Sequence, residues 1–201
     1  MQIFHHPNST FSRRVRIWAL EKGQDVELVP VDMVNREHKG DAFRAMNPYG
    51  KVPVLKHEDL VLYESAIILE YLEARYPDPP LFPEDLNEQA MTSLHIKLCD
   101  TYLAPHVGTI IFPKRFLPPE RWKKDAMDQA KAQIDKHLAI LEKQMEGKTY
   151  LAGEMFTLAD ICYMPLLEFR ELMELSLGPN LSAWCERIMS RDSATQTAPA
   201  A

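Results

Sequence analysis

The sequence predicts an α/β domain followed by an all-helical domain, and three observations support that division. Strand-like and helix-like patterns alternate over residues 2–76. A cluster of prolines, which breaks regular structure, follows at residues 77–83. From about residue 86 onward, only helical patterns remain. We therefore expect a first domain over residues 1–77, a linker over 78–86 and a second domain over 87–201.

The elements of the first domain follow from its local patterns. Apolar residues recur at helical spacing from Ser12, and Gly23 is a suitable C-cap. β-Branched residues within 26–31 favour a strand, and the polar residues 57–59 predict a hairpin turn. This order joins a βαβ unit to a ββα unit, which is the layout of a thioredoxin-like domain. The expected strands are 2–5, 26–31, 52–55 and 60–63, and the expected helices are 12–22, 41–46 and 65–76.

The second domain is predicted to consist of helices. Pro105 falls inside a long helical pattern and is expected to kink it. Thr157 and Asp160 have the spacing of a capping box, a folding device in which each side chain satisfies the main chain of the other. The small, polar residues 193–201 are expected to form a frayed tail. The expected helices are 87–112, 118–145 and 181–189.

Composition and charge exclude several classes of function. The 201 residues carry a formal net charge of -6 and no basic run, which argues against a nucleic-acid partner. The N-terminus lacks a signal core, and no apolar run approaches the roughly 20 residues that span a bilayer. We therefore expect no membrane partner. The cysteines are far apart, so we expect free thiols in a reducing, cytoplasmic compartment and no metal site. They are Cys99, Cys162 and Cys185.

The stretch 47–65 has the features of a peptide-binding edge. Pro53 has no N–H to give to a strand ladder, so it belongs at the start of a strand. A cis peptide at this place would turn the backbone of Val52 outward. The free N–H and C=O of Val52 would then pair with an extended peptide as an added strand does.

Glu64 and Ser65 are expected at the start of the next helix. A helix N-terminus attracts a carboxylate, and Ser65 is suited to cap the helix and donate a hydrogen bond. Glu64 is suited to hold an ammonium group. Together they offer a site for both ends of an amino acid. A hairpin followed by a capped helix, with no ligand, accounts for the same residues.

The pattern Asn-Pro-x-Gly-x-Val-Pro-x-Leu, followed by Glu-Ser-x-Ala-Ile, resembles the glutathione-binding core of the cytosolic glutathione S-transferases. The pattern is long and ordered, and the resemblance covers nearly the whole chain. It implies the glutathione transferase fold, with a thioredoxin-like domain before an all-α helical domain. Within the family, the chain resembles the serine-type theta, phi and zeta classes and is identified as a bacterial member.

The resemblance implies that Ser9 is the catalytic hydroxyl. A free thiol has a pKa of about 8.5, so an enzyme that uses glutathione must stabilise its thiolate. Ser9 stands where the serine-type classes place the hydroxyl that donates to that sulfur, between the first strand and the first helix. Asn8, Thr10 and a purely capping role for Ser9 are alternatives. The loop holds neither tyrosine nor cysteine, so tyrosine-type and mixed-disulfide chemistry fit poorly.

The resemblance also implies how glutathione, the co-substrate, is held. Cations in a polar loop and beside the third strand would bind the glycine carboxylate, although solvated charges are the alternative there. The main chain before the third strand would pair with the cysteinyl part, and the start of the following helix would bind the γ-glutamyl end. In that order, the residues are His38, Lys39 and Lys51; Val52 and Pro53; and Glu64 and Ser65.

The electrophile pocket is expected to be lined by the first loop and the long helix of the second domain. Thr10 and Phe11 would come from the loop. Tyr102, His106 and Ile110 are four residues apart, so they would share one face of a regular helix. Ordinary core packing or a subunit contact is the alternative for these three.

The implied function is conjugation of glutathione to a small apolar electrophile, with reduction of organic hydroperoxides as a second activity. The family is usually a two-fold dimer, so we expect a homodimer. A zeta-like isomerase is one alternative, although the segment 9–11 lacks the doubled serine and cysteine of that class. A non-catalytic relative is another, although such proteins often lose the activating residue or the glutamate–serine pair.

Overall fold

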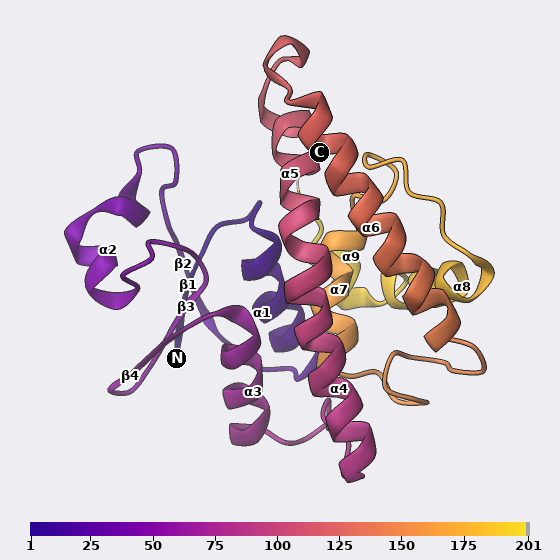
Figure 1. The fold of residues 1–201 in the computed structure, drawn as a ribbon. Helices are drawn as coiled ribbons and strands as arrows, with labels where there is room; N and C mark the ends of the chain where they lie inside the picture. The colour runs from indigo at the N-terminus through magenta and orange to yellow at the C-terminus, as the bar shows by residue number, and fades with distance from the viewer. Residues whose placement is uncertain (200–201) are drawn as a thin grey trace. The chain divides into compact units, whose positions relative to one another are not determined.

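The computed structural model describes residues 1–199, which form two compact units (Figure 1). The first unit consists of Met1–Leu81 together with the segment from Arg191 onward, and the second is Phe82–Ser190. The sequence placed a linker over residues 78–86 and everything after it in the second domain. The structure differs from that expectation because the C-terminal segment belongs to the first unit.

A four-stranded mixed sheet, in the order β2-β1-β3-β4, forms the centre of the first unit. β1 and β2 are parallel, and β3 is antiparallel to both β1 and β4. This topology confirms the predicted thioredoxin-like domain. β3 begins at Val54, one residue after Pro53, which the sequence placed at the start of the strand, because Pro53 stays outside the ladder. The strands are β1 (Gln2–His5), β2 (Glu27–Pro30), β3 (Val54–His57) and β4 (Leu60–Tyr63).

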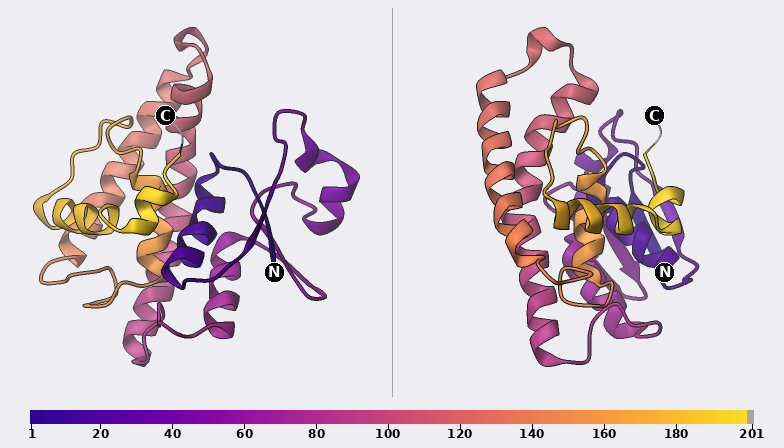
Figure 2. Two further views of the ribbon diagram at one scale, coloured as in Figure 1. Left: turned by 180° about the vertical axis from the view of Figure 1, so that it is seen from behind. Right: turned by 90° about the vertical axis from the view of Figure 1, so that its right-hand side faces the viewer.

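Helices cover both faces of this sheet. α1 and α3 lie together on one face, and the short helix α2 lies on the other (Figures 1 and 2). α1 begins two residues earlier than predicted because Ser9, and not a later residue, supplies the cap. The bounds are α1 (Thr10–Glu21), α2 (Asp41–Met46) and α3 (Ser65–Arg75), and the 3-10 turn η1 (Glu37–Lys39) precedes α2.

Apolar side chains are buried on both faces of the sheet. Ile3 and Leu55 are paired across β1 and β3 and are fully buried, as is Trp18 of α1. On the other face, Phe43 of α2 packs with Val54. Each such side chain contributes roughly 1.5–3 kcal/mol through burial, so the strands that lead to the site are held from both sides.

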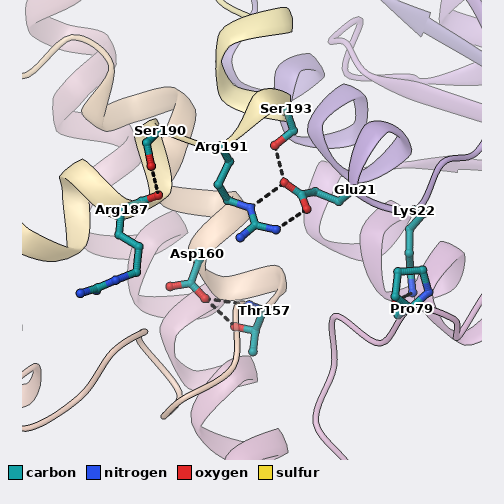
Figure 3. A network of polar contacts seen from close by, with 9 residues as sticks. All are labelled: Glu21, Lys22, Pro79, Thr157, Asp160, Arg187, Ser190, Arg191 and Ser193. Atoms are coloured by element: carbon teal, nitrogen blue, oxygen red, sulfur yellow. Dashed lines mark hydrogen bonds and ion pairs between the residues drawn. The ribbon is translucent and has the colours of Figure 1, made fainter.

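A buried carboxylate fastens α1 to α3. Glu73 of α3 accepts a hydrogen bond from Trp18 Nε1 at 3.3 Å and pairs with Lys22 Nζ at 2.8 Å. Its other oxygen accepts from the main-chain N–H of Leu81 at 2.7 Å. Lys22 also donates to the carbonyl oxygen of Pro79 (Figure 3). Because both charges are buried, removing either partner would leave the other uncompensated, at a cost of about 3–5 kcal/mol.

The C-terminal segment is an ordered helix, α9 (Asp192–Gln196), and not the predicted frayed tail. Arg13 of α1 donates to Thr197 Oγ1 at 3.0 Å and to the carbonyl oxygen of Ala194 at 2.9 Å. Figure 3 shows the second attachment, in which Glu21 accepts hydrogen bonds from Arg191 and Ser193. Polar bonds from α1 therefore order a segment that is too poor in apolar residues to be predicted as packed.

The second unit is built of helices, as predicted. α4, the π-helical turn η2 and α5 form one long rod, and α6 lies beside α5 (Figures 1 and 2). All ten residues of α7 are buried. No helix among residues 1–199 is long and apolar enough to cross a membrane. The bounds are α4 (Leu86–Leu98), η2 (Cys99–Leu103), α5 (Ala104–Phe116), η3 (Pro119–Arg121), α6 (Lys124–Gln144), α7 (Leu158–Leu167) and α8 (Pro179–Met189).

The long rod departs from the predicted helix in two ways. Pro105 has no N–H to give to the carbonyl of Thr101, and the turn just before it is π-helical. The rod then continues to Phe116, four residues beyond its predicted end. Pro118 and Pro119 stand at the start of the 3-10 turn η3 and not of a long helix, so α6 begins at Lys124 instead of residue 118.

The predicted capping box is confirmed at the start of α7. Asp160 accepts a hydrogen bond from the main-chain N–H of Thr157 at 2.8 Å. In return, the side-chain oxygen of Thr157 accepts a hydrogen bond from the main-chain N–H of Asp160. The same carboxyl group accepts from Trp184 Nε1 at 2.9 Å and from Leu151 N at 3.2 Å. Burial raises the pKa of Asp160, and these hydrogen bonds oppose that effect.

Candidate functional site

The structure brings the predicted site residues of the first unit to one edge of the sheet. Phe4 of β1 pairs with Val54 of β3, which pairs with Tyr63 of β4. In β2, Pro30 pairs with His5. The segments after β1, after β2, before β3 and after β4 therefore join the sheet at this same edge, which we name the site edge. They carry Ser9, Thr10 and Phe11; His38 and Lys39; Lys51, Val52 and Pro53; and Glu64 and Ser65, respectively.

Ser9 is the N-cap of α1. Its Oγ accepts a hydrogen bond from the main-chain N–H of Ser12 at 3.2 Å, and its own N–H donates to the carbonyl oxygen of His6 at 3.0 Å. The hydroxyl hydrogen is not used in these contacts. Ser9 is therefore half-buried at the positive end of a helix dipole, with a proton left to donate to an anion.

Arg14, which the sequence did not single out, connects the first loop to α3. It is fully buried, and its Nη1 donates to Ser65 Oγ at 3.1 Å. Its guanidinium carbon lies 4.8 Å from the centre of the Phe11 ring. Arg14 stands three residues before Ile17 and four before Trp18, both fully buried. In the sequence, Arg14 could have been recognised as a charged residue on the apolar face of the predicted helix.

Glu64, and not Ser65, occupies the cap position of α3. Its backbone has φ 70° and ψ 111°, and its exposed side chain makes no capping hydrogen bond. The expectation that Ser65 caps the helix is wrong, because Ser65 is the first helical residue and its oxygen accepts from Arg14. A positive φ outside glycine costs about 1–3 kcal/mol and is typical of functional positions. The unpaired N–H groups of the first turn are left facing the site edge.

The segment before β3 has the backbone expected from the sequence. The Val52–Pro53 peptide is cis, Pro53 is buried and Val52 is half-buried against the core around Phe43. Within residues 1–199, the main chain of Val52 makes no hydrogen bond. Its N–H and C=O are therefore available to an added peptide.

Cations gather beside this segment. Lys39 Nζ donates to the carbonyl oxygen of Gly50 at 2.9 Å, which fixes the ammonium group next to the exposed Lys51. Gly50 has φ 58°, and a Cβ there would lie 2.5 Å from the carbonyl oxygen of His38. Only glycine fits this close approach, so the position of the two cations depends on it.

His38 lies in a positive field. Burial lowers the pKa of His38, and the nearby charges of Lys39, Arg36, Arg44 and His6 lower it further. Its Nδ1 is buried and has no hydrogen-bond partner among residues 1–199. A carboxylate at this place would satisfy that nitrogen and offset the surrounding positive charge.

The predicted pocket residues of the second unit do not share one environment. Tyr102 is 54% exposed, and its ring is stacked 6.4 Å from that of His137. His106 is half-buried, whereas Ile110 is only 3% exposed. The π-helical turn η2 shifts the helical register after Tyr102, so spacing by four no longer aligns it with the two later residues. Ile110 is a core residue, which was the alternative reading.

Comparison with known proteins identifies both halves of the chain. A family model described as the N-terminal domain of glutathione S-transferase matches residues 3–80, and one described as its C-terminal domain matches residues 99–192. Glutathione S-transferase APIC of Nicotiana tabacum is 31% identical over 199 residues, which cover 95% of this chain and 93% of the tobacco protein. The chain belongs to the glutathione S-transferase family.

Solved structures of other glutathione transferases share the fold of this transferase over nearly their whole length. A theta-class enzyme from Xanthomonas axonopodis pv. citri, solved with glutathione bound, is 26% identical, with a TM-score of 0.91 over 100% of this chain and 97% of that chain. A glutathione transferase from Populus trichocarpa is 29% identical, with a TM-score of 0.87 over 98% and 96%. Enzymes of plants and bacteria are thus both similar to it.

The cysteines of this glutathione transferase all lie in the second unit, and all three are buried thiols. Burial raises the pKa of Cys185, which keeps that thiol protonated. Among residues 1–199, no group of three or more His, Cys, Asp or Glu side chains is arranged to hold a metal ion.

Proposed function

We propose that this transferase binds glutathione along the site edge and that Ser9 stabilises its thiolate for attack on a small apolar electrophile. The observation that carries the proposal is the position of the Ser9 hydroxyl. It caps α1 through its oxygen and keeps its hydrogen at the same edge as the cations, the open main chain and the start of α3.

The glycine carboxylate of glutathione is assigned to His38, Lys39 and Lys51. Lys39 is already held by Gly50, so little side-chain freedom is lost when it binds a carboxylate. The buried Nδ1 of His38 gains a partner. Charge-assisted hydrogen bonds of this kind contribute about 1.5–3 kcal/mol each.

The cysteinyl and γ-glutamyl parts are assigned to the next two segments along the edge. The main chain of Val52 would pair with the cysteinyl residue as a short added strand. The γ-glutamyl carboxylate would bind at the N-terminus of α3 and accept from Ser65, whose oxygen is held by Arg14. Glu64, exposed beside it, would hold the γ-glutamyl ammonium group.

The proposed chemistry needs one stabilised anion. The thiol gives its proton to solvent, and the thiolate accepts a hydrogen bond from Ser9 in the positive field of the α1 N-terminus. The sulfur then forms a bond to the electrophilic carbon, and the leaving group departs with its electron pair. Thr10 and Phe11 would border the electrophile. The same thiolate would attack a hydroperoxide oxygen, which breaks the O–O bond, releases the alcohol and leaves glutathione sulfenic acid. A second glutathione then forms the disulfide and releases water, so both activities depend on Ser9.

The test is a titration of bound glutathione, following thiolate absorbance from pH 5 to 9. We expect the wild-type complex to titrate well below about 8.5. Ser9→Ala should return the thiol towards that value and lower kcat about 10–100-fold, while the Kd for glutathione stays within about threefold. Glu64→Ala should instead raise that Kd about tenfold or more.

Two further variants separate Ser9 from its neighbours. Ser9→Thr keeps both the cap and the hydroxyl, so it should restore the shifted titration, whereas Ser9→Ala also loses about 1 kcal/mol of capping free energy. Thr10→Ala is the matched control and should leave the thiol shifted. Full activity in Ser9→Ala together with its loss in Thr10→Ala would transfer the role to Thr10.

We further propose a homodimer, which sedimentation velocity would test.

A further inference from the structure

A pocket lies in the first unit, and no residue assigned to glutathione lines it. It is formed by the later turns of α1, the connection to β2, β2 itself and α9, and it has a volume of about 290 Å³. This is at the small end of the range for ligand pockets, roughly 300–1,000 Å³. The residues that the following argument uses are Arg16, Leu20, Gln24, Asp25, Leu28 and Gln196.

Arg16 is the cation of this pocket. It is half-buried, and within residues 1–199 it makes neither an ion pair nor a side-chain hydrogen bond. Burial lowers the pKa of Arg16, and the positive charge of Arg13 lowers it further. Within the described residues no acidic side chain forms an ion pair with Arg16, so its partly dehydrated guanidinium has no direct partner. A planar anion would supply both hydrogen-bond acceptors and the missing charge.

Two side-chain amides accompany Arg16. The side chains of Gln24 and Gln196 line the pocket and make no hydrogen bonds within the described part of the chain. Thr197, in contrast, is already engaged, because its Oγ accepts from Arg13 and bonds to the carbonyl oxygen of Ser193. The two amides are therefore the polar groups left to complete the coordination of a small anion.

Apolar side chains supply the remaining wall. Leu20 is 43% exposed and Leu28 is 40% exposed, although both border the same pocket. A ligand that covered them would remove apolar surface from water, at a gain of about 25 cal/mol per Å². Asp25 also borders the pocket, and its charge disfavours a ligand with a second negative group.

We propose that this pocket binds a small amphiphilic monocarboxylate, with its carboxylate on Arg16 and its apolar body against Leu20 and Leu28. Phosphorylated ligands and dicarboxylates are disfavoured by Asp25. The site is separate from the glutathione site, so occupation of one leaves the other open. Because Thr197 connects the pocket to Arg13, a bound acid also holds α9 in place on α1.

The test uses phenylacetate as the probe and phenylacetamide as its uncharged match, with the full chain saturated with glutathione. Binding is measured by NMR on protein with ¹³C-labelled leucine methyl groups. We expect phenylacetate to shift the methyl signals of Leu20 and Leu28 and to bind at least tenfold more tightly than phenylacetamide.

Variants locate the binding energy. Arg16→Gln should weaken phenylacetate binding about tenfold or more, and Arg16→Lys should weaken it less. Gln196→Glu, on the exposed side of α9, should also weaken it by adding a negative charge. Arg75→Gln removes the same charge from the exposed end of α3 and should change nothing.

Three results would overturn the proposal. The first is no shift of the Leu20 and Leu28 methyl signals at tens of millimolar phenylacetate. The second is equal affinity for the acid and the amide. The third is binding that survives Arg16→Gln unchanged, which would place the acid elsewhere on the protein.

Discussion

Arg14 is the residue that links the two ends of the candidate site within the first unit. It lies in α1, five residues after the proposed catalytic Ser9, yet its Nη1 donates a hydrogen bond to Ser65 Oγ at the start of α3. It is fully buried, so it does not contact glutathione from solvent. Its influence passes through Ser65, which makes it a positioning residue for the γ-glutamyl end.

We predict that Arg14→Met raises the KM for glutathione about tenfold and changes kcat less than about threefold. The reason is that Ser65 loses a charged donor worth about 1.5–3 kcal/mol, whereas Ser9 keeps its cap and its hydroxyl. Steady-state kinetics with a standard aryl halide electrophile would measure both constants. Arg14→Lys should recover part of the KM. A fall in kcat with an unchanged KM would assign Arg14 to the thiol instead.

For single residues, the sequence predicted which positions form the site better than it predicted what each residue does in its local structure. The position of Ser9 at the start of α1 and the cis peptide before Pro53 follow from rules about hydroxyl caps and proline. The backbone of Glu64 does not, because a positive φ in glutamate is imposed by the surrounding fold. For the same reason the cap was assigned to Ser65, one residue too late.

Helix α9 is the element that the sequence missed, and it is held by side chains more than by apolar packing. Arg191 donates to both oxygens of Glu21, at 2.7 and 2.6 Å, and Ser193 donates to the same carboxylate. These bonds lower the pKa of Glu21, although burial alone would raise it. Both partners lie about 170 residues away from Glu21 in sequence, beyond the reach of any local pattern.

We predict that Arg191→Gln releases α9 from α1. The free energy of unfolding should fall by about 1–2 kcal/mol, a moderate value because the arginine side chain is 32% exposed. Amide exchange near Ala194 and Thr197 should quicken about tenfold or more, as measured by hydrogen–deuterium exchange. Arg187→Gln is the matched control, since Arg187 is exposed, donates to the carbonyl oxygen of Thr149 and lies over the Tyr150 ring, both in the second unit. Equal effects of the two changes would contradict a specific clamp.

Other elements were predicted because their signals are local. β1 and β4 match the predicted bounds, as does α2, since alternation and turn residues mark their ends. The rod from α4 to α5 was predicted as one kinked helix, because Pro105 reveals that a hydrogen bond is missing but not how the preceding turn adapts. That adaptation decides which residues reach the face with Tyr102.

For the whole molecule, the response to acid depends on buried histidines. His95 of α4 is fully buried, and neither of its ring nitrogens has a hydrogen-bond partner among residues 1–199. Burial, followed by the charges of Lys148 and His137, lowers the pKa of His95 to about 4. Burial also lowers the pKa of His137. The folded chain therefore resists protonation that the unfolded chain accepts below about 6.5.

The sign of the effect follows from proton uptake. Between about pH 6.5 and 4 the unfolded state binds a proton at His95 that the native state does not, so stability is full above this window and falls as the pH falls. His95 alone should account for about 3 kcal/mol across it, at 1.36 kcal/mol per pKa unit. Burial raises the pKa of Asp160, and that carboxyl group acts in the opposite direction where it retains its proton.

We therefore predict that the free energy of unfolding, measured with urea at pH 7 and at pH 4.5, falls on acidification and that the share of this fall due to His95 is absent from His95→Leu. His95→Asn should flatten the same dependence even if it costs stability at pH 7, because it also removes the titrating group while leaving a polar side chain buried. The two variants together separate proton uptake from packing. A pH dependence that persists unchanged in both would mean that acid acts on the chain through groups other than His95.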